Sequence, residues 1–155
     1  MRQVLLASAF AVACGFAVLT APGVHAAMLT FGNPTQFYGG TNCADVTSAS
    51  ITPGTPVEAR PCNGAQNEQF QWNGKAIIAL GDQRRLDVYG GVVFAGAKVD
   101  SWTCTGNTIQ QWYYYKGQIQ TFVNELCLDA GAGNSSTQLI VSICNGSANQ
   151  QWQIK

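Results

Sequence analysis

The sequence has little charge and a single histidine. Lysine and arginine together number eight, aspartate and glutamate also number eight, and charged residues make up 10% of the 155 residues. The one histidine, His25, precedes the part of the chain that we expect to fold. Without histidine, that part lacks the usual general base and the commonest zinc ligand. Its few charges form no basic field that would bind nucleic acid or an anionic membrane surface.

A helical period is also lacking between residues 31 and 155. Short β-prone runs alternate there with turn clusters such as Thr52-Pro53-Gly54, and Asn73-Gly74 and Lys116-Gly117 fall where hairpin turns are expected. This alternation is typical of many short strands, and therefore of an all-β protein. Nothing in the sequence places two acids opposite each other, as glycoside hydrolysis requires. We therefore expect no enzyme activity, no bound metal and no cofactor.

Residues 1–26 have the pattern of a secretory signal peptide. Arg2 is followed by an apolar run from Val4 to Leu19, and the segment ends in the small-residue stretch Val24-His25-Ala26. The alternative is a membrane anchor, for which the run is too short. Cleavage after Ala26 would leave residues 27–155, with eight acids and seven bases, as a single domain. The sequence thus predicts a secreted, extracellular protein that does not insert into membranes.

Two earlier segments of the chain are similar to one short stretch, Asn149-Gln150-Gln151-Trp152. They are Gln110-Gln111-Trp112 and Asn67-Glu68-Gln69-Phe70. In each of the three stretches the aromatic residue lies eight residues after a cysteine. A buried aromatic side chain removes roughly 150–250 Å² from water. We therefore expect Phe70, Trp112 and Trp152 to build one shared core that no single repeat could build alone.

A second landmark keeps the same period. Asp45, Asp87 and Asp129 lie 42 residues apart, and the three aromatic positions lie 42 and 40 residues apart. The landmarks define three units, at about residues 31–75, 76–117 and 118–155. Propeller blades have a similar period, but a propeller typically has four to eight blades. A closed threefold arrangement of short strands is the better interpretation.

The combination of Cys-x-Asp, a second cysteine and Asn-Gln-x-Trp, repeated three times, resembles the ricin B-type lectin domain. The resemblance covers essentially all of residues 27–155. It implies a β-trefoil, in which a six-stranded barrel is capped by three hairpins. It also implies a non-catalytic lectin that binds galactose-type or related glycans on glycoproteins or cell surfaces. In many relatives such a module accompanies an enzyme or toxin chain.

The repeat also suggests how the cysteines pair. Five of them follow residue 26, and secretion favours disulfide formation. We expect Cys43–Cys62 and Cys127–Cys144 bridges, each contributing about 3 kcal/mol. In the second unit Arg85 occupies the first cysteine position, which leaves Cys104 as a buried free thiol. The alternatives for Cys104 are an intermolecular disulfide and a reactive thiol.

The family resemblance implies five sugar-contacting positions per unit. They are the aspartate of Cys-x-Asp, the positions four and two residues before the second cysteine, and the Asn-Gln pair. In the first unit these positions hold Asp45, Glu58, Arg60, Asn67 and Glu68. In the second unit they offer Asp87, Asp100, Trp102 and Gln110. In the third unit they offer Asp129, Asn149 and Gln150.

No unit carries the complete set. Arg60 stands where the family often has an aromatic residue, and Ile109 replaces the asparagine of the second unit. In the third unit Ile140 and Ser142 fall where a glutamine and an aromatic residue are expected. Trp102 is the candidate platform for the apolar face of a sugar ring. Several weak sites on one rigid body would act through avidity.

Two other interpretations stay open. In the first, Asp45, Asp87 and Asp129 have a structural role and hold turns, while Gln110 and Gln150 satisfy backbone groups beneath the strands. Alternatively, the trefoil is a scaffold whose loops, at Ser48–Pro56 and Tyr89–Ala97, bind a protein, as a protease inhibitor or secreted effector would. Glycosylation sequons at Asn134 and Asn145 both lie in the third unit, where a glycan on Asn145 would crowd Asn149.

Overall fold

The computed structural model describes residues 27–31, 42–131 and 136–154, and this part of the chain consists of short strands and single 3-10 turns. The strands are β1 (Ala27–Phe31), β2 (Asn42–Val46), β3 (Thr55–Pro61), β4 (Gln69–Asn73), β5 (Ala76–Ala79), β6 (Arg84–Val88), β7 (Val99–Trp102), β8 (Trp112–Tyr115), β9 (Gln118–Thr121), β10 (Cys127–Asp129), β11 (Thr137–Gln138), β12 (Ile140–Ser142) and β13 (Trp152–Ile154). The 3-10 turns are η1 (Thr47–Ala49), η2 (Gln66–Glu68), η3 (Tyr89–Gly91), η4 (Thr108–Gln110) and η5 (Ala148–Gln150). The all-β fold class expected from the sequence is confirmed.

Two of the sequence-based predictions fall outside these residues. The signal peptide expected at residues 1–26 lies outside the described residues, and so does the sequon at Asn134. Among the residues that are described, no helix is long and apolar enough to cross a membrane.

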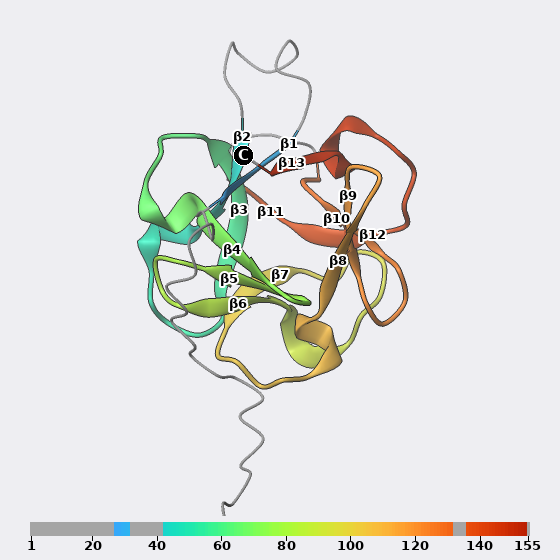
Figure 1. Cartoon of the computed structure of the whole chain (residues 1–155), viewed down its shortest axis with the longest axis horizontal. Helices are drawn as coiled ribbons and strands as arrows, with labels where there is room; N and C mark the ends of the chain where they lie inside the picture. The colour runs from blue at the N-terminus through green and yellow to red at the C-terminus, as the bar shows by residue number, and fades with distance from the viewer. Residues whose placement is uncertain (1–26, 32–41, 132–135, 155) are drawn as a thin grey trace, which may run out of the picture.

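The strand pairings join the three units into one closed body. β1 pairs with β2 and β4 of the first unit and also with β13 at the other end of the chain, where Leu29 lies opposite Ile154. β3 pairs with β7 of the second unit and β11 of the third. Figure 1 shows the result, with the chain passing from the left of the view through the bottom to the right. The arrangement is the β-trefoil that the sequence predicts, as the solved structures compared below also show.

Two hairpins lie where the sequence predicts them. β4 and β5 are joined through Gly74 and Lys75, because Asn73 lies opposite Ala76. β8 and β9 are joined through Lys116 and Gly117, which have φ angles of 49° and 83°. Two-residue hairpin loops with positive φ match the right-handed twist of the flanking strands.

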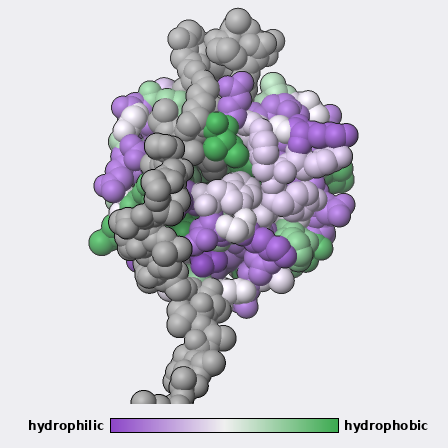
Figure 2. Space-filling model, viewed as in Figure 1, coloured by the Kyte–Doolittle hydropathy of each residue, from purple (hydrophilic) through white to green (hydrophobic). Residues whose placement is uncertain are grey.

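The repeated aromatic residues meet in a single core. Phe70, Trp112 and Trp152 are 1%, 0% and 1% exposed and belong to one buried cluster. The indole N–H of Trp112 donates to the Leu86 carbonyl oxygen at 2.9 Å, and that of Trp152 donates to the Leu128 carbonyl oxygen at 2.8 Å. The prediction of a shared aromatic core is confirmed. Outside it, hydrophobic residues lie in separate groups on the face shown in Figure 2 rather than in one large patch.

Two predicted disulfides are confirmed and one cysteine prediction is wrong. Cys43–Cys62 and Cys127–Cys144 are both bonded, each with a Cα–Cα distance of 5.1 Å. Cys104 is disulfide-bonded and is not the expected free thiol. The sequence left Cys104 without a predicted partner because Arg85 holds the position of the first cysteine in its unit.

Candidate functional site

Each unit positions its candidate residues with the same three elements. A strand that ends near the aspartate pairs with a second strand, and a 3-10 turn before the core aromatic residue lies beside them. These elements are β2, β3 and η2 in the first unit, β6, β7 and η4 in the second, and β10, β12 and η5 in the third.

The last candidate position of each unit is fully buried and structural. Glu68, Gln110 and Gln150 are each 0% exposed. Gln150 accepts a hydrogen bond from the Asn145 amide at 2.8 Å and donates to the Ile143 carbonyl oxygen at 3.0 Å. None of these three side chains lines the pocket described below, and their hydrogen bonds are made to their own chain. The structural alternative therefore accounts for these three residues.

The same bracing recurs in the other two units. Gln110 accepts from the Thr105 amide at 2.9 Å and donates to the Thr103 carbonyl oxygen at 2.9 Å. Glu68 accepts from the amides of Asn63 and Gly64, at 2.9 and 2.8 Å. The residue that follows the family's asparagine thus fixes the loop after the second cysteine in all three units.

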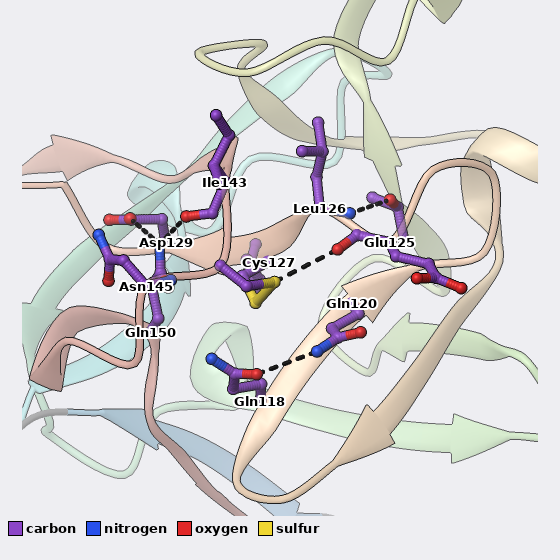
Figure 3. The surroundings of a disulfide bond; sticks show 12 residues. Gln118, Gln120, Glu125, Leu126, Cys127, Asp129, Ile143, Asn145 and Gln150 are labelled. Carbon is purple, nitrogen blue, oxygen red and sulfur yellow. Dashed lines mark hydrogen bonds between the residues drawn. A yellow bond between two sulfur atoms is a disulfide. The ribbon is translucent and has the colours of Figure 1, made fainter.

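In the third unit the aspartate is fully used by its own chain. Asn149 and the Gly131 amide donate to one oxygen of Asp129, at 2.5 and 2.7 Å, and Gln150 donates to the other at 2.7 Å. Figure 3 shows Asp129, Gln150 and Ile143 converging on one side of the Cys127–Cys144 disulfide. Since Ile140 and Ser142 supply no aromatic platform, this unit has the polar positions without a stacking surface.

In the first unit the acids are matched by a cation from the same strand. Asp45 lies opposite Glu58 in the β2–β3 register. Arg60 donates to Glu58 at 2.9 Å, and its Nε lies 3.9 Å from Asp45. Asn67 donates to the other Asp45 oxygen at 2.8 Å. Burial and then the charge of Glu68 raise the pKa of Asp45 to about 6, while Arg60 and Asn67 oppose the rise.

The second unit differs because its acids open into a pocket. Asp87 lies opposite Asp100 in the β6–β7 register. The pocket has a volume of about 340 Å³, and Trp102 and Tyr89, which are 40% and 58% exposed, form part of its wall. Its lining consists of Asp87, Tyr89, Gly90, Gly91, Asp100, Trp102, Thr105, Asn107 and Ile109. Of the predicted positions of this unit, the pocket brings together Asp87, Asp100 and Trp102 and leaves out Gln110.

The two carboxyl groups of this pocket have raised pKa values, because burial disfavours their charged forms. Burial raises the pKa of Asp87 to about 6, and a hydrogen bond from Gln110 partly opposes the rise. Burial, followed by the like charge of Asp87, raises the pKa of Asp100 to about 7. Asp100 is 1% exposed, and within the described part of the chain neither of its carboxylate oxygens accepts a hydrogen bond from another residue. Desolvated carboxylates of this kind favour a ligand that donates hydrogen bonds.

The structure corrects one inference from the sequence. Acids do lie opposite each other, as Asp45 with Glu58 and as Asp87 with Asp100. The sequence does not reveal this because the register depends on how β6 pairs with β7. Glycoside hydrolysis needs carboxyl groups that flank the scissile bond. Asp87 and Asp100 instead lie opposite each other on two neighbouring strands, and both line one pocket.

Several residues that line the pocket are not among the predicted sugar-contacting positions, and Ile109 was named only as the replacement of the family's asparagine. Thr105 and Asn107 lie in the loop that Gln110 braces, and Ile109 comes within 3.9 Å of a side chain built on Gly91. Their place between the second cysteine and the Gln-x-Trp stretch is a signal that would have indicated them. Tyr89, two residues after Asp87, reaches the pocket because Gly90 and Gly91 turn the chain with φ angles of 76° and 77°.

Trp102 is supported by a loop of the first unit. A Cβ placed on Gly54 would lie 2.9 Å from the six-membered ring of Trp102, so the ring lies against bare backbone. The Gly54 amide donates to the Ser101 carbonyl oxygen at 2.9 Å, which holds the loop in place. Within the described residues, no group of three or more histidine, cysteine, aspartate or glutamate side chains is arranged to hold a metal ion.

Comparison with known proteins gives a consistent picture. The family described as "Ricin-type beta-trefoil lectin domain" matches residues 34–152. Polypeptide N-acetylgalactosaminyltransferase 15 of Mus musculus is 30% identical over 117 residues, which are 72% of this chain and 18% of that protein. The chain therefore spans less than a fifth of that relative's length.

Solved structures share the fold at low sequence identity. The designed threefold-symmetric protein ThreeFoil has a TM-score of 0.72 at 21% identity, with 83% of this chain and 96% of that chain covered. A non-toxic homologue of type II RIPs from Momordica charantia, solved in complex with α-methyl-D-galactoside, has a TM-score of 0.72 at 23% identity, with 86% of this chain and 48% of that chain covered.

Proposed function

This chain belongs to the ricin-type β-trefoil lectin family, and from that premise we propose that it is a secreted, non-catalytic lectin whose second unit binds galactose-type glycans. The pocket beneath Trp102 carries the proposal, because it combines an exposed indole face with buried acceptors. An aromatic face covers the apolar face of a sugar ring, and carboxylates accept from its hydroxyl groups. Trp102, Asp87 and Asp100 supply these two parts.

The preference for galactose-type sugars has support from the neighbouring structures. The Momordica charantia protein was solved with a galactoside, and it shares the fold of this chain. Secretion has support from the disulfides Cys43–Cys62 and Cys127–Cys144, because such bonds persist in oxidising compartments. The proposed ligands are accordingly glycans of glycoproteins or cell surfaces.

A glycan array tests the proposal. We expect the folded protein to bind galactose-terminated glycans and the Trp102→Ala variant to bind them at least about tenfold more weakly, since about 1.4 kcal/mol of lost ring contact gives that factor. Tyr115→Ala is the matched control, because Tyr115 is a 52% exposed aromatic residue that does not line this pocket. A blank array with folded protein, or equal losses in both variants, would refute the proposal.

A second candidate function rests on the loops. Val92 and Phe94 are 63% and 57% exposed in the loop Tyr89–Ala97, and Ile51 is 68% exposed in the loop Ser48–Pro56. Exposed apolar loop residues of this kind suit a protein partner, as a protease inhibitor or secreted effector would have. This candidate gains ground if the array stays blank while a secreted protease is inhibited, and if Phe94→Ala removes that inhibition.

A further inference from the structure

The first and second units each contain a pair of neighbouring acids, but the groups that compensate the two pairs differ. Each places two acids opposite each other, as Asp45 with Glu58 and as Asp87 with Asp100. Buried like charges are costly unless a cation or hydrogen-bond donors compensate them. The two pairs can therefore be compared by asking which group supplies the compensation.

In the first unit part of the compensation is internal, although Asp45 Oδ1, like three carboxylate oxygens of the second unit, is buried without a hydrogen-bond partner in the described chain. Arg60 donates to Glu58 at 2.9 Å, lies 3.9 Å from Asp45, and opposes the rise in the pKa of Asp45. Its side chain is 38% exposed, so the guanidinium contacts both the acid pair and the solvent. Any ligand of this unit would have to displace a cation that is already bonded.

In the second unit the corresponding position is Trp102, which has no charge. Arg85 lies opposite Trp102 in the β6–β7 register, yet no basic side chain is among the groups that shift the pKa of Asp87 or Asp100. One oxygen of Asp87 and both oxygens of Asp100 lack a hydrogen-bond partner in another residue of the described chain. The pair is thus buried and acidic, is compensated only by the Gln110 hydrogen bond to Asp87, and lines the pocket.

The walls of the pocket also suit a cation. Trp102 and Tyr89 present exposed aromatic surface beside the carboxylates. Aromatic faces attract ammonium groups, and Trp does so most strongly. Hydrogen bonds from an ammonium to a carboxylate are roughly twice as strong as those between neutral groups. A sugar that carries a free amino group matches both features at once.

We propose that the Trp102 pocket selects amino sugars with a free ammonium group, such as galactosamine, over their neutral and N-acetylated counterparts. The ammonium takes the place in the second unit that the Arg60 guanidinium holds in the first, and donates to Asp100 and Asp87. This inference rests on the proposed sugar-binding function of the same pocket. It narrows the ligand class to cationic hexosamines and to glycans that contain them.

Calorimetric titration of the full chain at pH 6.5 with galactosamine, galactose and N-acetylgalactosamine tests the inference. We expect galactosamine to bind about tenfold more tightly than either neutral sugar. We also expect protons to be released on binding, because a bound ammonium favours the ionised form of Asp100. The release is measured by repeating the titration in buffers of different ionisation enthalpy, and a neutral sugar should give little of it.

Two variants remove the preference in different ways. Asp100→Asn removes one carboxylate, and Trp102→Arg copies the internal cation of the first unit while keeping both acids. Each should bring the ratio of galactose to galactosamine dissociation constants to about one. Glu125→Gln is the matched control for the loss of one negative charge, because Glu125 is exposed and lies outside the pocket. It should leave the ratio unchanged.

The possible results distinguish failure of the amine preference from failure of sugar binding itself. Equal affinity for all three sugars, with Trp102→Ala weakening each of them, overturns the amine preference and leaves the lectin intact. Absence of binding to every sugar overturns the lectin itself. Binding of Ca²⁺ that depends on Asp100, with no preference for the amino sugar, also overturns the inference, because the acids would then serve a metal ion.

Discussion

At the scale of single residues, one buried position distinguishes the first unit from the other two. Gln110 and Gln150 each accept from a loop amide and donate to a backbone carbonyl, whereas Glu68 only accepts. Glu68 is 0% exposed, and its charge contributes to the raised pKa of Asp45. The first unit thus has a carboxylate at a buried position where the other two units have the amides of Gln110 and Gln150.

Replacing Glu68 with glutamine should therefore stabilise the protein. We expect Glu68→Gln to raise the free energy of unfolding at pH 7 by about 1 kcal/mol, because the amide keeps the accepted bonds, adds a donor and removes a buried charge. The pKa of Asp45 should fall, since its like-charged neighbour is gone. Urea unfolding and NMR titration of the Asp45 carboxyl measure the two effects. Destabilisation by Glu68→Gln, together with a neutral effect of the reverse change Gln150→Glu, would contradict this interpretation.

At the scale of elements, the β6–β7 pair makes the fold less stable as pH rises. The pKa values of Asp87 and Asp100 are raised from 3.8 to about 6 and about 7. Between the unfolded and folded values the native state binds more protons than the unfolded state, so the free energy of unfolding falls as pH rises. The loss begins near pH 4 and is complete once the pH exceeds the folded value of Asp100.

The variant Asp100→Asn should remove much of this dependence. We expect it to raise the free energy of unfolding at pH 8 by about 2 kcal/mol and to change it little at pH 4, where the carboxyl is already protonated. Denaturant unfolding across pH 4–8, with the wild type beside the variant, gives the comparison. Parallel curves for the two proteins would show that Asp100 is not the source of the slope.

A loop of the first unit should control the ligand affinity of the second. Gly54 has a φ of 85°, and a methyl group there would meet the Trp102 ring at 2.9 Å. We expect Gly54→Ala to weaken galactose binding several-fold and to cost about 1 kcal/mol of stability. Gly96→Ala, with a φ of 96° and open space around it, is the control that should lose stability alone. Unchanged binding in Gly54→Ala would mean that the Trp102 ring does not depend on this contact.

Sequence and structure agree to different degrees at this scale, for a physical reason. Phe70, Trp112 and Trp152 were predictable as one core because a strict period and large apolar rings leave few other arrangements. The opposition of Asp87 and Asp100 was not predictable, since it depends on the register of two strands separated by an irregular loop. Gln110 was predicted as a ligand contact from its motif but is buried. The motif gives the place of a residue in the chain and not the direction of its side chain, so the sequence could not show this.

At the scale of the whole molecule, the three units share a frame but differ in what they leave open. The first closes its acid pair with Arg60, and the third commits Asp129 to Asn149, Gln150 and the Gly131 amide. Only in the second unit do acids and an exposed tryptophan share a pocket, as far as the described residues show. This difference favours a single principal site over avidity among several weak ones.

The most direct measurement follows the tryptophan indole N–H resonances by NMR while galactose or galactosamine is added to the folded chain. The account predicts that the Trp102 signal shifts with a stoichiometry of about one sugar per chain, while Trp112 and Trp152, which are buried and bonded to Leu86 and Leu128, stay in place. Sugar binding that leaves the Trp102 signal in place would contradict this prediction. So would shifts of resonances from the first and third units as large as the shift of the Trp102 signal.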